Sequence, residues 1–383
     1  METCVWDDTF DSPIYSVIQP DSLIFHNDSR FACNSPLTLC PLWLSPFFSG
    51  GEKMEKENGF SRRDLLKATG AIGGIMLSQN VLAASAPSPG GDKVLAGVIE
   101  MHVHGAPDIT PRVVQEIELA QKVKEVGLRI VVFKCHDFIT NDWAYMVKLM
   151  VPGVEVFGGI ALNEPVGGIN PVAVETMLKF TGGLGRYVWL PTRDAAYQKA
   201  VNANKPDAGG VRVTDSAGAV LPDIRKVMKI VAKADAILGT GHIAPQESLA
   251  VVKAAKEEGV RKIVITHAMQ DPLFMSQDEM KRCAEMGAYI EHCYLSHLMG
   301  PMAPAAGFRG RKGVPLDEFV KAIKGVGAER TVVATDLGQT HNPTPVDGMR
   351  EFIRQLMKKG VTEAEMDLMT RKNPARLLGL ESF

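Results

Sequence analysis

The chain has 383 residues, of which 45% are hydrophobic and 22% charged, and its formal net charge is −2 at pH 7. It lacks the basic excess of proteins that bind nucleic acid or anionic membranes, so we expect neither nucleic acid nor a lipid surface as a partner. No stretch, including the apolar part of the segment discussed next, is long and apolar enough to cross a bilayer, which needs roughly 20 apolar residues, and we expect no stable membrane insertion.

Residues 54–86 have the layout of an export signal. Arg62 and Arg63 precede a short, glycine-containing apolar stretch over residues 71–77, and small residues follow up to Ala86. This segment resembles a twin-arginine signal, which implies the twin-arginine export machinery as a partner and a periplasmic or otherwise exported protein after cleavage. An amphipathic basic helix is the alternative, but it gives the small residues no role.

Residues 1–53 show no sustained hydrophobic period of either 2 or 3.6. Export signals stand at a true N-terminus, yet this segment precedes the arginine pair. We therefore interpret it as a mis-assigned or disordered extension and expect translation to begin at Met54. A genuine regulatory extension is the alternative, and no motif supports it. Residues 87–383 are then expected to form the functional domain.

From residue 93 onward, short apolar segments rich in β-branched residues alternate with longer amphipathic segments. The first kind is typical of strands buried on both faces, and the second of helices that begin near proline and end near glycine. The predicted strands are residues 94–104, 128–136, 154–162, 187–191, 236–242, 262–267, 288–292 and 331–336. The predicted helices are residues 111–126, 142–150, 171–180, 222–234, 246–258, 277–286, 315–324, 345–358 and 363–378.

Eight such units in roughly 290 residues predict an α/β fold of the (β/α)8 TIM barrel type, whose usual size is about 250 residues. An open doubly wound sheet is the alternative, but it requires a glycine-rich phosphate turn after the first strand, which residues 105–108 do not form. Residues 201–221 predict a β-hairpin inserted after strand 4, and residues 298–314 a long loop after strand 7. Both insertions lie on the side where barrel active sites occur.

His102 and His104 close the first predicted strand. Side chains at i and i+2 leave a strand from the same face, so the pair directs two nitrogen donors toward one point, as a divalent metal requires. A His-X-His triplet also arises by chance, but further histidines fall at the ends of predicted strands and favour a metal enzyme; they are His136, His242, His267 and His292. His292, like His341 in a later loop, either assists catalysis or orders the loops.

Predicted strands 5, 6 and 8 end in His242, His267 and Asp336. Together with the histidine pair, this order resembles the amidohydrolase superfamily, with His-X-His after strand 1, one histidine after each of strands 5 and 6, and an aspartate after strand 8. The resemblance covers about residues 93–380. It implies that His102, His104 and Asp336 hold one metal. His242 and His267 then hold a second metal, or one binds the first metal and the other polarises the substrate.

The superfamily usually places a bridging carboxylated lysine or a glutamate after strand 4, where this sequence has no such residue. The nearest lysine, Lys134, ends strand 2. Three roles stay open for it: a carbamylated bridge between two metals, a cation that holds a substrate carboxylate, or a strand-end charge. Glu164 and Asp194 are spare carboxylates, each more typical of a solvated loop. The number of ions is therefore one or two, and the ligand types favour zinc, with manganese or iron as alternatives.

These ligands predict hydrolysis of an amide, lactone or ester bond in a small substrate by a metal-activated water. Asp336 is the candidate that takes the proton from the water, and His267 or His242 the candidate that polarises the scissile carbonyl. Three arginines in loops of the active face are candidates for binding a substrate carboxylate, although each one alone is more typical of an ordinary surface residue. They are Arg193, Arg309 and Arg311.

Two other functions fit the same sequence. A single metal with a substrate-binding arginine implies a decarboxylase, since relatives on this scaffold perform that lyase chemistry. A non-catalytic periplasmic binding protein is the other alternative, but it has little use for the proton carrier Asp336. Beyond the extension, Cys135, Cys283 and Cys293 are too few to predict a disulfide framework. The oligomeric state is open, with a homo-oligomer among the alternatives.

Overall fold

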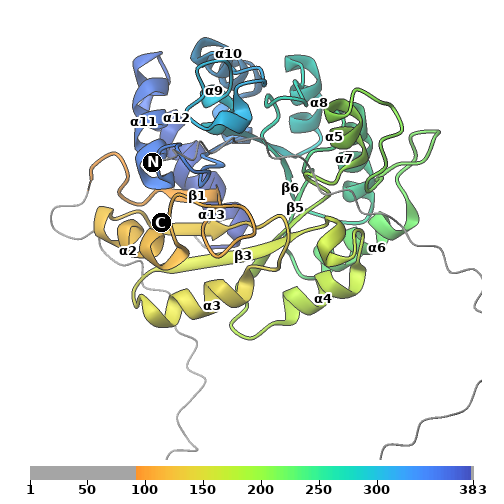
Figure 1. The fold of residues 1–383 in the computed structure, drawn as a ribbon, viewed down its shortest axis with the longest axis horizontal. Helices are drawn as coiled ribbons and strands as arrows, with labels where there is room; N and C mark the ends of the chain where they lie inside the picture. Colours follow the sequence, from red (N-terminus) through yellow and green to blue (C-terminus); the bar gives the residue numbers. More distant parts are fainter. Residues whose placement is uncertain (1–91, 381–383) are drawn as a thin grey trace, which may run out of the picture. The chain divides into compact units, whose positions relative to one another are not determined.

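Eight parallel strands lie side by side in chain order in the computed structural model, which describes residues 92–380. Figure 1 shows them around a central axis with the helices outside. The strands are β1 (Ile99–Val103), β2 (Ile130–Phe133), β3 (Glu155–Ala161), β4 (Gly185–Trp189), β5 (Ile237–Gly239), β6 (Lys262–Ile265), β7 (Tyr289–Cys293) and β8 (Thr331–Ala334). The predicted signal over residues 54–86 and the extension over residues 1–53 lie outside the described residues.

The barrel closes between β8 and β1. The backbone N–H of Asp336 donates to the carbonyl of His102 at 2.9 Å, and that of His104 donates to Leu337 at 2.8 Å. All residues of β1, β2 and β8 are buried, because the helices cover the outer face of the strands and packed side chains fill the inner one. Closure therefore brings the ends of the first and last strands together.

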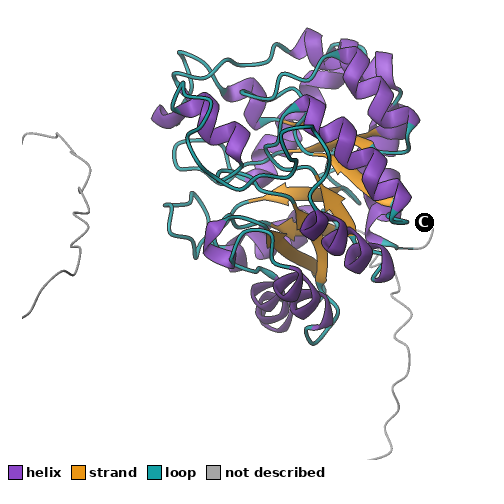
Figure 2. Cartoon of the chain, turned by 90° about the vertical axis from the view of Figure 1, so that its right-hand side faces the viewer, coloured by secondary structure: helices purple, strands orange, loops and turns teal. Residues whose placement is uncertain are grey.

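Helices follow the strands and cover the outside of the barrel. They are α2 (Glu116–Val126), α3 (Asn141–Met150), α4 (Pro171–Lys179), α5 (Ala196–Asn202), α6 (Pro222–Lys233), α7 (Pro245–Glu257), α8 (Gln277–Glu285), α9 (Leu295–Leu298), α10 (Leu316–Val326), α11 (Pro345–Lys358), α12 (Glu363–Asp367) and α13 (Asn373–Leu378). No described helix has the length and apolar character needed to span a membrane. Figure 2 shows the longer loops gathered at one end of the strands.

The helix predicted from residue 111 begins only at Glu116. The preceding segment folds back on the end of β1, where the N–H of Ala106 donates to Val114 and the N–H of Glu116 donates to Ala106, both at 2.9 Å. These tertiary hydrogen bonds satisfy backbone groups that a longer helix would have used. The result is an ordered loop over the mouth of the barrel.

The insertion after β4 contains the predicted hairpin in a shortened form. Around the turn at residues 215–218, the N–H of Asp215 donates to Ala219 at 2.9 Å, the N–H of Leu221 donates to Val213 at 3.0 Å, and Thr214 and Val220 form an antiparallel bridge. The segment before it differs, because α5 extends to Asn202 and Val211 pairs with the backbone of Asp194 and Ala196. The predicted long loop after β7 is confirmed, and it begins after the short helix α9.

Candidate metal centre

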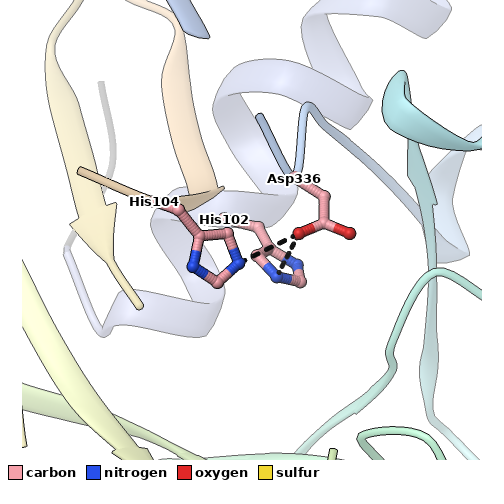
Figure 3. Close-up of side chains that lie close together, drawn as sticks. All are labelled: His102, His104 and Asp336. Atoms are coloured by element: carbon pink, nitrogen blue, oxygen red, sulfur yellow. Dashed lines mark hydrogen bonds and ion pairs between the residues drawn. The ribbon is translucent and has the colours of Figure 1, made fainter. Parts of the chain in front are cut away.

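Three side chains from the two ends of the closed sheet converge at one point. The Nε2 atom of His102 lies 3.1 Å and the Nε2 atom of His104 3.2 Å from Oδ1 of Asp336 (Figure 3). All three residues are buried. Two imidazole nitrogens and one carboxylate oxygen are a donor set that zinc and related divalent ions bind. The structure thus brings together the three residues predicted to hold the first ion.

Glu291, on β7, contacts the nitrogen of His102 that does not face Asp336. Its Oε2 atom lies 3.1 Å from Nδ1 of His102 and accepts the backbone N–H of His267 at 3.0 Å. A carboxylate on the far nitrogen of a ligating histidine fixes the orientation of the ring and raises its basicity. We did not predict Glu291 from the sequence, although an acidic residue inside a predicted buried strand could have indicated a functional role.

Five imidazole rings form a closed circuit around the centre. In order, the distances between ring centroids are 5.7 Å from His102 to His104, 4.9 Å to His136, 6.1 Å to His242, 4.7 Å to His267 and 5.8 Å back to His102. The predicted residues His242 and His267 are therefore adjacent to each other and to the first cluster. His136 also belongs to the circuit.

Lys134 lies among these rings. It is only 2% exposed, and its Nζ atom has no hydrogen-bond partner among the described residues. Nζ lies 5.7 Å from the ring centroid of Trp189. Burial is the largest cause that lowers the pKa values of the five histidines. The positive charge of Lys134 is a further lowering cause for every one of them. Burial in turn lowers the pKa of Lys134 itself.

The charge states of Asp336 and the surrounding histidines suit the binding of a cation. Burial alone would raise the pKa of Asp336, but the charge of His102 and hydrogen bonds from both ring partners hold it well below its usual range. Burial disfavours the charged form of His102, yet the carboxylates of Asp336 and Glu291 raise its pKa to about 9. Burial lowers the pKa of the other four rings, that of His267 to about 4. An ionised carboxylate therefore faces mostly neutral imidazoles.

The backbone is strained where two of these side chains leave their strands. His267 and Asp336 have φ angles of 30° and 54°, in the left-handed region that non-glycine residues rarely adopt. Hydrogen bonds from the two backbone N–H groups hold them there, to Glu291 and His102 respectively. Strain of this kind is typical of functional sites, where the surrounding fold fixes the direction of a side chain.

Gln270 and Ser296 form a chain of polar contacts that ends at Oδ2 of Asp336. The Nε2 atom of Gln270 lies 3.4 Å from Oδ2 of Asp336, and the hydroxyl of Ser296 donates to Oε1 of Gln270 at 2.9 Å. All three residues are buried. Oδ1 of Asp336 is thereby directed at the histidines, while Oδ2 faces an amide. Neither Gln270, in the loop after β6, nor Ser296, in the four-residue helix α9 after β7, was predicted, because segments this short carry no periodic signal.

The candidate substrate arginines are each bonded to the protein itself. Arg193 pairs with Asp137, and Arg311 donates to Asp271 at 3.1 Å and to Asn202 at 2.6 Å. Arg309 donates to a backbone carbonyl at 3.2 Å. The spare carboxylates Glu164 and Asp194 lie within 2.6 Å and 3.5 Å of Lys199 rather than among the five rings. Binding of substrate by Arg193 or Arg311 stays a prediction.

His292 points away from the centre. Its neighbour Glu291 contacts His102 inside the barrel, so the alternation of the strand places His292 on the outer face. There its ring packs against Phe319 of α10 with centroids 5.4 Å apart, and neither nitrogen has a partner among the described residues. Burial lowers the pKa of His292 to about 4.

We expect His292→Leu to stabilise the protein selectively at acid pH. The unfolded chain binds a proton at an ordinary histidine pKa of about 6.5, whereas the folded chain resists it down to about 4. The free energy of unfolding therefore falls as pH falls through this window, by up to about 3 kcal/mol for this group. Urea denaturation at pH 7 and pH 4.5, with chelator in both samples, should show the advantage of the variant growing by about 2–3 kcal/mol. An equal pH dependence of both proteins would contradict the burial of a neutral ring.

The sequence pattern of a family of unknown function, DUF6282, matches residues 97–291. None of the curated proteins with which the chain was compared matches it. Among solved structures, an organophosphorus hydrolase from Deinococcus radiodurans is 15% identical with a TM-score of 0.50, over 74% of this chain and 94% of that one. An amidohydrolase from Pseudomonas aeruginosa is 12% identical with a TM-score of 0.49, over 74% and 97%. The likeness to the organophosphorus hydrolase, with the eight strands in order, confirms the predicted (β/α)8 barrel.

Proposed function

Because this chain belongs to the DUF6282 family, whose function is unknown, we propose a function from its own centre: a metal-dependent hydrolase of a small molecule. The observation that carries the proposal is the convergence of His102, His104 and Asp336 at the carboxyl ends of β1 and β8. Active sites of barrel enzymes occupy this end of the strands. The organophosphorus hydrolase that shares the fold is itself named for hydrolysis.

The residues present fit a divalent ion. Buried polar atoms without partners cluster here among the described residues, including both nitrogens of His267 and Nζ of Lys134. Such atoms cost free energy unless a ligand or water satisfies them. His102, His104 and Asp336 would hold the ion, and zinc is the ion we propose from the ligand types, with manganese or iron as alternatives. A bound ion of this kind supplies Lewis-acid activation of a water molecule and of a substrate carbonyl.

Asp336 is the proposed proton carrier. Its Oδ1 atom faces the two histidines, which leaves Oδ2 as the atom that accepts a proton from the attacking water and passes it to the leaving group. Gln270, itself held by Ser296, orients Oδ2 through its amide. A low pKa suits a group that must be ionised when the water arrives. The same steps serve an amide, a lactone or an ester.

Lys134 is the residue whose role decides between one ion and two. A neutral, buried amine among five imidazoles fits a carbamylated bridge, and a cation there fits a substrate carboxylate. The metal content per chain distinguishes these two roles of Lys134. Loss of one of two ions in Lys134→Ala indicates the bridge, whereas one ion in both proteins favours the cation.

The proposed function is tested on purified protein loaded separately with zinc, manganese and iron. Substrate panels of 4-nitrophenyl esters, small lactones and N-acyl amino acids cover the three bond types. We expect one class to be hydrolysed, and we expect a chelator to abolish the activity and the returned ion to restore it. A protein that retains a metal but hydrolyses no member of the panels overturns hydrolysis on these bond types. A protein that retains no metal overturns the centre altogether.

Removal of the ion is also expected to destabilise the fold. An ion that binds only the folded chain adds RT ln(1 + [L]/Kd) to the free energy of unfolding, about 4 kcal/mol at 1,000 times Kd. Thermal denaturation with and without chelator should therefore show a fall in Tm of several degrees. The same comparison on Asp336→Ala should show a much smaller fall, since that variant lacks a ligand. Equal chelator effects in both proteins would contradict the assignment.

A further inference from the structure

We propose that His136 and His242 form a donor–acceptor pair that recognises a substrate with an N–H group beside its carbonyl. Nε2–H of His136 is the donor of this pair, and the bare Nε2 of His242 is the acceptor. An amide offers both an acceptor and a donor, whereas an ester or a lactone offers acceptors alone. This inference deepens the proposed function and rests on it, because it selects one of the three bond types.

His136 and His242 lie on the open side of the circuit of rings. Both residues are partly exposed, whereas His102, His104 and His267 are no more than 2% exposed. The two open rings meet edge to face with centroids 6.1 Å apart, and the ring of His136 stacks on that of His104. One amide group can reach both rings, since each hydrogen bond spans about 2.9 Å between heavy atoms. These two rings are therefore the ones that meet a substrate entering from solvent.

Nδ1 of His136 accepts a hydrogen bond. It lies 2.8 Å from the hydroxyl of Thr192, whose oxygen also accepts Nδ2–H of Asn163 at 2.7 Å. The orientation of the Asn163 amide is fixed, because its Oδ1 accepts the backbone N–H groups of Thr192 at 2.8 Å and Asp194 at 3.3 Å. Thr192 is fully buried, and an unpaired buried hydroxyl hydrogen would cost free energy. The hydroxyl of Thr192 therefore donates to Nδ1 of His136, and the neutral ring carries its proton on Nε2.

Nδ1 of His242 instead donates a hydrogen bond. It lies 3.0 Å from Oε1 of Gln198, and Nε2–H of Gln198 donates to Oδ1 of Asn202 at 2.9 Å. Oδ1 of Asn202 also accepts Nη2–H of Arg311 at 2.6 Å. An arginine can only donate, so the atom of Asn202 that it meets is an oxygen, and this fixes the orientation of the Gln198 amide in turn. The oxygen of Gln198 therefore faces His242, whose neutral ring carries its proton on Nδ1 and leaves Nε2 bare.

The two chains of hydrogen bonds give the two rings opposite polarity. Burial lowers the pKa of both rings well below its usual value, so each ring is neutral and has one N–H. Neither Nε2 atom has a hydrogen-bond partner within the described part of the chain. Nε2–H of His136 can thus donate to a carbonyl oxygen, and Nε2 of His242 can accept the N–H beside it. A site built to bond a substrate N–H rejects the analogue that lacks it, because a polar group of the site is then left unpaired.

The tautomers are tested on purified protein with isotopically labelled histidine, both zinc-loaded and in chelator. Nitrogen NMR shows which nitrogen of a neutral ring carries the proton, and His136→Gln and His242→Gln assign the two rings by the signals that they remove. We expect Nε2–H for His136 and Nδ1–H for His242. Thr192→Val keeps the shape of the side chain without the hydroxyl, so it should give His136 a mixture of tautomers. The same tautomer in both rings of the wild type, or the reverse in each, overturns the proposal.

Thr176→Val is the matched control for Thr192→Val. The hydroxyl of Thr176 donates to the carbonyl of Val172 at 2.8 Å on the exposed side of α4, far in sequence from either ring. This variant should leave both tautomers and the activity unchanged. A change of the His136 tautomer in Thr192→Val alone would support the assigned chain of hydrogen bonds, and an unchanged tautomer there would overturn it.

The recognition is tested on the panels of esters, lactones and N-acyl amino acids. We expect the amides to be hydrolysed, and we expect kcat/KM to fall about 10-fold or more when the N–H of the best amide is methylated. His242→Phe keeps a ring without the acceptor, so the ratio between the two amides should fall toward one. Hydrolysis of esters or lactones without any amide overturns the inference but leaves the proposed function standing. A zinc-loaded protein that hydrolyses no member of the panels overturns both.

Discussion

Asp336→Asn is expected to reduce hydrolysis by about 10³-fold or more and to release the ion held by His102 and His104. A carboxamide keeps the shape of the side chain, but it cannot accept the proton from water and is a far weaker ligand. The loss combines a general-base effect of about 10²–10⁴ with the loss of the ion that activates the water. The measurements are kcat on the best substrate of the panels and zinc content per chain.

Asp317→Asn is the control for that experiment. Asp317 is an exposed carboxylate at the start of α10 that pairs with Lys359 at 2.9 Å, so the same chemical change there should leave both readouts unaltered. If Asp336→Asn keeps its zinc and loses only kcat, Asp336 carries the proton without holding the ion. If it keeps both, the centre does not perform the chemistry we propose.

The barrel was predictable because its signals are local and repeated. Each strand is a short apolar run, and several helices begin at proline or end near glycine, so eight repeats outweigh errors of a few residues at the boundaries. The cluster of His102, His104 and Asp336 was predictable for the same reason, since all three residues stand at the ends of such runs. The hairpin after β4 was predictable from its turn residues, but it is shorter than predicted because Val211 pairs with Asp194 and Ala196, a tertiary contact that no local pattern encodes.

Whether the other residues reach the centre depends on which face of its strand each one occupies, and the sequence alone does not determine that face. His292 was placed at the mouth, but the register of β7 turns it outward and brings Glu291 inward. A shift of one residue exchanges the two faces of a strand, and the sequence does not fix that register. Gln270, in the loop after β6, and Ser296, in α9, come from different strand connections, so only the folded chain reveals their contact.

Glu291→Ala is expected to lower zinc affinity by 10- to 100-fold, the typical cost of losing the partner behind a ligating histidine. Glu291 holds the ring of His102 through Nδ1 and the strained backbone of His267 through its N–H, so one carboxylate orients two histidines of the centre. Glu291→Gln should lose less, because its amide oxygen can still accept a hydrogen bond from both groups. The measurement is competition for zinc against a chelator of known affinity.

The difference in zinc affinity between Glu291→Gln and Glu291→Ala distinguishes a role of Glu291 in positioning the ligands from a role in the stability of the fold alone. If Glu291 served only to fill the barrel, Glu291→Gln would match the wild type in zinc affinity, and Glu291→Ala would lose free energy of unfolding but not zinc. The control is Glu116→Gln on α2, another buried carboxylate, whose oxygens have no hydrogen-bond partner among the described residues. Its zinc affinity should be unchanged. The order wild type, Glu291→Gln, Glu291→Ala in zinc affinity, at similar stability in chelator, would show that a residue which need not touch the ion sets the geometry of its ligands.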